Sequence, residues 1–181
     1  MSDAAAMNRF LSGVEKKAFH IANLAVKDVD EAMDIVQDSM MTLVRRYSAK
    51  NESEWKPLFY RILRNRITDF HRRAVIRNRI MGFFRLPNSE EDGADPILQA
   101  PAGYAVEPAF QVQMQATSEK LGKAIEVLPG RQREAFLLRV WEGLSVQDTA
   151  RAMNCSEGSV KTHYSRAVHT LREVLGDDHE Q

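Results

Sequence analysis

The chain has 181 residues, 44% of them hydrophobic, and 25 basic side chains balance 25 acidic ones. This length suits one large or two small domains, and the hydrophobic content is sufficient for folded cores. Cys155 is the only cysteine, which excludes a disulfide within the chain and fits a reducing compartment. No apolar run approaches the roughly 20 residues that cross a bilayer, and no signal peptide is visible at residues 1–25, so we expect a soluble cytoplasmic protein.

The zero net charge conceals a strong segregation of charge along the chain. Residues 45–80 hold eleven Lys and Arg against three Asp and Glu, a local net charge of +8. The other segments are acidic, with −3 in residues 1–44, −4 in 81–115 and −1 in 116–181. Because screening limits charge interactions to about 10 Å at 0.1 M salt, the basic block attracts an anionic partner although the total is balanced.

Helical periodicity dominates the sequence and alternating strand patterns are scarce, which predicts an all-helical fold. In the first half of the chain we expect three helices, at about residues 4–26, 29–47 and 53–80. The second begins behind Asp28 or Asp30. The third carries Pro57 in its first turn, where a missing N–H is tolerated best.

One side of the second predicted helix is apolar and the other is polar. The buried stripe at helical spacing contains Val29, Ala32, Val36, Met40, Leu43 and Tyr47. The side chains that face away include Asp34, Gln37, Asp38 and Met41. A methionine exposed among carboxylates and an amide indicates a protein-docking face, because Met adapts to an apolar partner while the acids set its orientation. The alternative is a solvated face with a scattered apolar residue.

The third predicted helix has an apolar side and a cationic side. The cationic side carries Arg61, Arg64, Asn65, Thr68, His71 and Arg72. Guanidinium groups spaced three and four residues apart follow a phosphate backbone, and the nearby Tyr60 offers a ring for stacking on unpaired bases. A merely solvated face normally mixes both signs, whereas Asp69 is the only acid between Glu54 and Ile80. We therefore favour nucleic-acid binding for this helix.

The composition changes over residues 81–115, which contain four prolines, three glycines and a cluster of acids. This segment is longer than ordinary loops inside a compact domain, which predicts a linker. We therefore expect two small helical domains, residues 1–80 and 116–181, joined by a flexible acidic linker over residues 81–115.

Residues 144–175 have the pattern of a helix-turn-helix. Ser145 and Asp148 form a capping box that begins a short helix, Asn154 and Cys155 turn the chain, and a longer helix follows. This second helix has no acid from residue 158 to residue 172, and opposite its apolar stripe lie Thr162, Ser165, Arg166 and His169, flanked by Lys161. Such a face fits phosphates and base edges in a major groove. An ordinary helical hairpin with a solvated outer face is the alternative.

An enzyme is the hypothesis from a different class. The five histidines form no recognisable ligand set with Cys155, and the sequence has neither a glycine-rich phosphate loop nor a nucleophile elbow. We therefore expect a protein that is not an enzyme, with no catalytic residue, no metal and no cofactor.

The order and spacing of these segments resemble bacterial RNA polymerase sigma factors of the extracytoplasmic-function (ECF) group, which have only the second and fourth conserved sigma regions. In the first domain the resemblance rests on DIVQD at 34–38 and YRILRN at 60–65, with Asp69, Arg72 and Arg73. In the second it rests on LP at 128–129, Arg133, GLS at 143–145, DTA at 148–150, SVK at 159–161, RA at 166–167 and LR at 171–172. Met40, Trp55 and Leu58 depart from the usual aromatic pattern, but these are apolar exchanges in a core.

The resemblance implies a role for each surface. It implies docking on the clamp helices of the polymerase largest subunit by Asp34, Gln37, Asp38 and Met41. It implies that the minus-10 promoter element is bound as it opens by Tyr60, Arg61, Arg64, Asn65, Thr68 and Arg72. It implies that the minus-35 element is read by Ser159, Lys161, Thr162, Ser165, Arg166 and His169.

The partners implied by the resemblance are core RNA polymerase, promoter DNA and an anti-sigma factor. The protein would insert into no membrane itself, and retention of this cytoplasmic protein at the inner membrane through the anti-sigma factor is an option. The expected function is promoter-specific initiation of transcription. The competing hypothesis is a helix-turn-helix regulator that acts without being a polymerase subunit, but residues 1–80 have cationic helices where such a regulator needs an input module.

Overall fold

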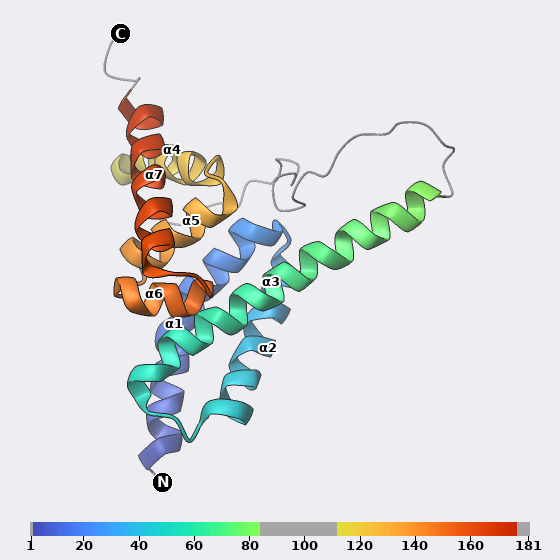
Figure 1. Ribbon diagram of the computed structural model, residues 1–181, viewed down its shortest axis with the longest axis vertical. Coiled ribbons are helices and arrows are strands. Elements are labelled where there is room, and N and C mark those ends of the chain that lie inside the picture. The colour runs from blue at the N-terminus through green and yellow to red at the C-terminus, as the bar shows by residue number, and fades with distance from the viewer. Residues whose placement is uncertain (1, 84–111, 177–181) are drawn as a thin grey trace. The chain divides into compact units, whose positions relative to one another are not determined.

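The computed structural model describes residues 2–83 and 112–176 (Figure 1). All regular elements within these two ranges are helical, which confirms the all-α fold class. The elements are α1 (Ser2–Val26), α2 (Val29–Tyr47), α3 (Glu52–Phe83), α4 (Val112–Glu126), α5 (Gly130–Phe136), the π-helical segment η2 (Leu137–Trp141), α6 (Val146–Met153) and α7 (Glu157–Gly176). They divide into two compact units, of which the first holds α1, α2 and most of α3, and the second holds α4 to α7.

The linker predicted for residues 81–115 lies largely outside the described residues. Its two ends are helical, because α3 continues to Phe83 and α4 begins at Val112.

The first unit is built on the packing of α1 against α2. Lys27 connects them with a left-handed φ of 55°, and the Asp28 side chain then caps α2 by accepting the Glu31 backbone N–H at 3.0 Å. Small residues on both helices are fully buried, among them Ala18, Ala22 and Ala32. Small side chains allow two helices to approach closely.

The aromatic core of the first unit comes from α3. Trp55 and Leu63 of this unit are buried, and the Trp55 ring lies 5.9 Å from that of Phe10 between ring centroids. The Trp55 Nε1–H donates to the Tyr47 carbonyl at 3.2 Å, which ties the start of α3 to the end of α2. The far end of α3 extends beyond α2 in Figure 1.

The buried stripe predicted for α2 is partly wrong. Val29 is 47% exposed, whereas Ile35 and Ser39 are buried beside Ala32, Val36 and Leu43. Val29 is the first helical residue, where the chain turns from α1, so helical periodicity does not hold it against the core. The Ser39 hydroxyl is tolerated in the core because it donates to the Ile35 carbonyl at 2.6 Å.

The predicted helix-turn-helix is confirmed in the second unit. The Ser145 Oγ accepts the Asp148 backbone N–H at 3.0 Å and donates to the Asp148 carboxylate at 2.9 Å, so α6 begins where the capping box predicts. Asn154 ends α6 in a left-handed conformation, with φ 51° and ψ 52°. The Cys155 N–H then donates to the Ala150 carbonyl at 3.1 Å. Asn tolerates this conformation better than other side chains, so the turn needs no glycine.

The core of the second unit lies beneath α7. Val160, Ala167 and Leu171 are buried along one stripe of α7 and pack with α5 and α6, which bury Ala135 and Met153. Between α5 and α6 the helix widens into η2, where the Glu142 N–H donates to the Leu137 carbonyl five residues back at 3.0 Å. A π-type turn has no periodic signature of its own, so the helical periodicity of the sequence does not reveal it.

None of the helices in the described ranges combines the length and apolar content that spanning a bilayer requires.

The capping box makes a testable contribution to stability. Replacing Ser145 with Ala removes the acceptor of the Asp148 N–H, and we expect the free energy of unfolding to fall by about 1 kcal/mol. Urea denaturation followed by circular dichroism measures this change. Ser165→Ala is the matched control, because Ser165 is exposed in the middle of α7 and caps nothing. Equal stability of the two variants would contradict the capping role.

Candidate nucleic-acid interface

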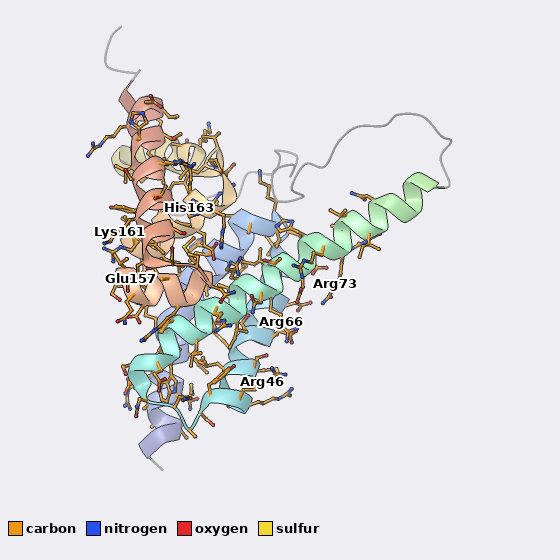
Figure 2. The ribbon with its side chains drawn as sticks, in the orientation of Figure 1. Arg46, Arg66, Arg73, Glu157, Lys161 and His163 are labelled. Carbon is orange, nitrogen blue, oxygen red and sulfur yellow. The ribbon has the colours of Figure 1, made fainter. Side chains whose placement is uncertain are left out.

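The outer face of α7 is opposite its buried stripe. Lys161, Thr162, Ser165, Arg166 and His169 are all exposed, and Ser159 is half-buried at the start of the helix. Figure 2 shows Lys161 on this helix near the turn that follows α6. The structure thus brings the residues predicted to read the minus-35 element onto one continuous helix.

Two hydroxyls of this face are tied to the first turn of α7. The Ser156 Oγ accepts the Ser159 N–H at 3.1 Å and lies 2.9 Å from the Ser159 Oγ, while the Thr162 hydroxyl donates to the Gly158 carbonyl at 3.0 Å. A hydroxyl that donates one hydrogen bond keeps lone pairs for accepting another. The first turn therefore presents oriented acceptors together with the cationic side chains.

The basic side chains on the outer face of α7 differ in whether they contact an acidic side chain. Within the described part of the chain Arg166 has no ion-pair partner, whereas the Nε2 of His169 lies 3.2 Å from a carboxylate oxygen of Glu173. Glu173 follows the stretch without acids by one residue and lies one helical turn after His169. It lowers the net positive charge at this end of the face.

The second cationic face lies along α3. Arg61, Asn65 and Arg72 are exposed, and Arg64 and Thr68 are half-buried, with the Thr68 hydroxyl donating to the Arg64 carbonyl at 2.9 Å. The Arg72 guanidinium lies 3.9 Å from the Asp69 carboxylate, the one acid on this stretch of the helix. A long, exposed pair of this kind is weak, so Arg72 stays available to a phosphate.

Tyr60 differs from the other residues predicted to contact the minus-10 element. It is only 2% exposed, and its ring lies edge-on to that of Phe59 with 5.2 Å between centroids. Burial raises the pKa of its hydroxyl well above the ordinary value, so Tyr60 is neutral at any physiological pH.

Sequence reasoning missed Arg66, which points from α3 toward α2. Its Nη1 lies 3.9 Å from the Asp38 carboxylate and its Nη2 donates to the Thr42 hydroxyl at 3.4 Å. Asp38 and Thr42 are one helical turn apart and therefore lie on the same side of α2. The spacing of this acid and hydroxyl was the available signal, but it does not identify which residue of another helix contacts them. Figure 2 labels Arg66 between Arg46 and Arg73.

The exposed face of α2 combines acids with apolar side chains. Asp34, Gln37, Asp38 and Met41 are all exposed, as the sequence pattern predicts for this face. The pattern missed three further exposed apolar residues that share the outer side of α2, namely Val29, Met33 and Val44. Met33 and Met41 are 47% and 48% exposed. Their spacing of two helical turns was the signal that could have revealed the stripe.

Comparison with known proteins adds an independent observation. The family model described as Sigma-70, region 4 matches residues 118–171. An RNA polymerase sigma-E factor of Streptomyces antibioticus is 30% identical over 150 residues, which cover 83% of this chain and 73% of that protein. The ECF RNA polymerase sigma factor SigM of Mycobacterium tuberculosis (strain ATCC 35801 / TMC 107 / Erdman) is 28% identical over 179 residues, covering 96% and 79%.

A solved structure agrees with these sequence matches. It is the co-crystal structure of the sigma factor RpoE in complex with the anti-sigma factor NepR from Bartonella quintana. The sigma factor chain is 26% identical to this chain with a TM-score of 0.60, and the match covers 96% of this chain and 98% of that one. The chain therefore belongs to the sigma-70 family of RNA polymerase sigma factors, in the extracytoplasmic-function group.

Proposed function

We propose that this chain binds core RNA polymerase and directs promoter-specific initiation of transcription. In this proposal α7 recognises the minus-35 element and α3 recognises the minus-10 element. The single observation that carries it is the exposed outer face of α7, which has no acid from residue 158 to residue 172, in a helix-turn-helix that matches sigma-70 region 4.

The geometry of α7 supports duplex recognition. A helix fits the major groove when one face is free of the protein core, and the stripe of Val160, Ala167 and Leu171 leaves the opposite face entirely exposed. We assign contact with the minus-35 element to Ser159, Lys161, Thr162, Ser165, Arg166 and His169.

The geometry of α3 supports binding of the minus-10 element. From Arg61 to Arg72 the helix rises about 16 Å, which corresponds to roughly five base steps of 3.4 Å. We assign direct contact with the minus-10 element to Arg61, Arg64, Asn65, Thr68 and Arg72. Tyr60 is buried in this structure, so its stacking on an unpaired base requires that its ring be uncovered when the promoter is bound.

The exposed face of α2 supports docking on the polymerase. An apolar stripe of Met33 and Met41, bordered by Asp34 and Asp38, offers contact area together with charges that fix orientation. We assign polymerase binding to Asp34, Gln37, Asp38 and Met41, and extend the surface to Met33.

We assign sigma region 2 to residues 1–80, the linker to 81–115 and sigma region 4 to 116–181. The protein acts in the cytoplasm through binding and catalyses no reaction of its own. Because the structural relative was crystallised with an anti-sigma factor, we include such a factor among the partners, and it provides a route for retention at the inner membrane. A helix-turn-helix regulator that acts without polymerase is the competing function, and family membership favours the sigma factor.

The assignment of α3 is tested by the double substitution Arg61→Ala with Arg64→Ala. We expect binding to core polymerase to be nearly unchanged, because these side chains are not on the α2 surface, while the yield of open complex falls at least tenfold, the equivalent of about 1.4 kcal/mol. Permanganate footprinting of a supercoiled promoter measures strand opening. The matched control replaces Arg9 and Lys16, two exposed cations of α1, with Ala. Normal opening by the α3 variant would contradict the assignment.

The assignment of α7 is tested by Arg166→Ala in reconstituted holoenzyme. We expect binding to promoter DNA to weaken by about 1–3 kcal/mol, because Arg166 is exposed and has no ion-pair partner within the described residues. Competition with a panel of minus-35 variants shows whether the loss depends on sequence, as for a base contact, or is uniform, as for a phosphate. No loss on any variant would remove Arg166 from the interface.

The assignment of α2 is tested by replacing Met33 and Met41 together with Ser. Burial of each thioether side chain against an apolar partner contributes about 1.5–3 kcal/mol, so we expect at least tenfold weaker binding to core polymerase. Fluorescence anisotropy of the labelled chain measures this affinity. Val174→Ser is the control, because Val174 is exposed to a similar degree on α7. Equal affinity of the double variant and the wild type would exclude this surface.

A further inference from the structure

Opposite charges gather on neighbouring helices of the first unit. Residues 28–38, which are the cap and the first half of α2, hold five acids and no Lys or Arg, whereas residues 70–78 of α3 hold three arginines and no acid. The ion pair between Arg66 and Asp38 shows that α2 and α3 lie side by side next to both segments. The first unit therefore carries one patch of each sign in the same region.

The acidic patch consists of Val29, Asp30, Met33 and Asp34 at the start of α2. The two aspartates are exposed one helical turn apart, and each directly follows an apolar side chain that is 47% exposed. Neither aspartate has an ion-pair partner among the described residues. The patch thus offers two unpaired carboxylates beside apolar area.

The cationic patch consists of Arg73, Ile76 and Arg77 on the part of α3 that extends beyond α2 in Figure 1. The two arginines are exposed one helical turn apart, and Ile76 beside them is 57% exposed. Within the part of the chain that the structure describes, both arginines also lack an ion-pair partner. This patch has the same make-up as the acidic patch, with the opposite charge.

The cationic patch is distinct from the face of α3 proposed to bind the minus-10 element. A helix turns by about 100° per residue, so Arg73 and Arg77 lie at least about 100° around α3 from Arg61 and Arg72. The exposed Ile76 adds apolar area, which a phosphate backbone would leave in water and a protein surface would bury. These features favour a protein over DNA as the ligand of the cationic patch.

The two patches match each other in charge and in spacing. On each helix the charged side chains are four residues apart, which is a rise of about 6 Å along the helix axis. Two carboxylates at this spacing fit two guanidinium groups at the same spacing, while the isoleucine fits the apolar pair on α2. Among the described residues of one chain no ion pair joins the two patches, so a second copy can supply the partner of each.

We propose that two copies of this chain form a dimer in which the cationic patch of each copy binds the acidic patch of the other. A twofold axis makes this contact twice, and the opposite charges set the orientation. Only a few side chains of each copy take part, so we expect a weak dimer with a dissociation constant of about 10–100 µM.

The dimer has a consequence for the binding of polymerase. The acidic patch shares Met33 and Asp34 with the surface of α2 that we propose binds the polymerase. The dimer and the polymerase complex therefore exclude each other, and self-association holds the chain in an inactive form at high concentration. This consequence rests on the proposed function, whereas the dimer itself does not.

The experiment measures the mass of the full chain by sedimentation equilibrium between about 1 and about 200 µM. At about 50 mM salt we expect the mass to rise with concentration from 20.6 kDa toward twice this value. At about 500 mM salt, screening of the paired charges should raise the dissociation constant at least tenfold. A wild type that stays monomeric at every concentration and at both salt concentrations would overturn the proposal.

Charge reversal tests whether the two patches form the interface. Arg73→Glu with Arg77→Glu should leave the chain monomeric, because carboxylates then face carboxylates. Asp30→Arg with Asp34→Arg should have the same effect, because guanidinium groups then face each other. An equimolar mixture of the two double variants should form a dimer again, since every patch then faces its opposite charge. A dimer that survives both reversals, or a mixture that stays monomeric, contradicts the proposed contact.

The matched control is Arg9→Glu with Lys16→Glu, which reverses two exposed cations of α1. It changes the net charge of the chain by as much as the reversal in the cationic patch does, and it should keep the wild-type dimer. Loss of the dimer in this control would show that net charge, and not the two patches, governs association. If the reversal of Arg73 and Arg77 keeps the dimer and instead weakens binding to promoter DNA, the cationic patch binds DNA and the proposal is wrong.

These measurements contain no polymerase, which separates this inference from the proposed function. A chain that is monomeric throughout and directs polymerase to defined start sites refutes only the dimer. A chain that forms the dimer and directs polymerase to no start site refutes only the proposed function. When both hold, core polymerase added to the dimer should convert it into complexes with one copy of the chain.

Discussion

The second unit depends on the left-handed turn at Asn154. This single residue turns the chain between α6 and α7, and the Cys155 N–H donates to the Ala150 carbonyl. The turn thereby sets the direction in which α7 leaves α6. Val160, Ala167 and Leu171 are buried in the core, and the polar side chains on the other side of the same helix are exposed among the described residues. Recognition chemistry on α7 is thus a consequence of how α6 ends. Because Arg131 donates to the Met153 carbonyl, the end of α6 also holds a cation from α5.

In the first unit a single long helix, α3, has two roles. It contributes side chains to the core, and it carries the exposed cations that we propose bind an anionic ligand. Near its start α3 buries Trp55, Phe59 and Leu63, and beyond them its polar side chains outnumber the apolar ones. The first part of α3 is held by packing and the later part is available for binding. Arg66 marks the transition, because it lies on the inner side of the helix and is still satisfied there by Asp38 and Thr42.

Much of this architecture is readable from the sequence because it depends on local rules. Caps at Asp28 and Ser145 and the apolar period of α7 predict where helices begin and which side they bury. What the sequence does not reveal depends on register and packing between segments. The burial of Tyr60 and the ion pair of Arg66 are decided by which segments lie alongside them, and the exposure of Val29 by its place at the start of α2. The widening at η2 depends on a shift of one hydrogen bond from the fourth to the fifth preceding residue, which leaves the composition unchanged.

The contact between Arg66 and Asp38 couples the two working surfaces of the first unit. Asp38 belongs to the face assigned to the polymerase, and Arg66 belongs to the helix assigned to the promoter. A partner that engages the carboxylate releases the guanidinium and leaves α3 with more uncompensated positive charge. Thermodynamic linkage then requires the reverse effect: DNA that binds the Arg66 guanidinium frees the Asp38 carboxylate for the protein partner. Because this ion pair is exposed and 3.9 Å long, the coupling free energy between the two binding events is less than about 1 kcal/mol. Each binding event then slightly favours the other, and no conformational change is needed.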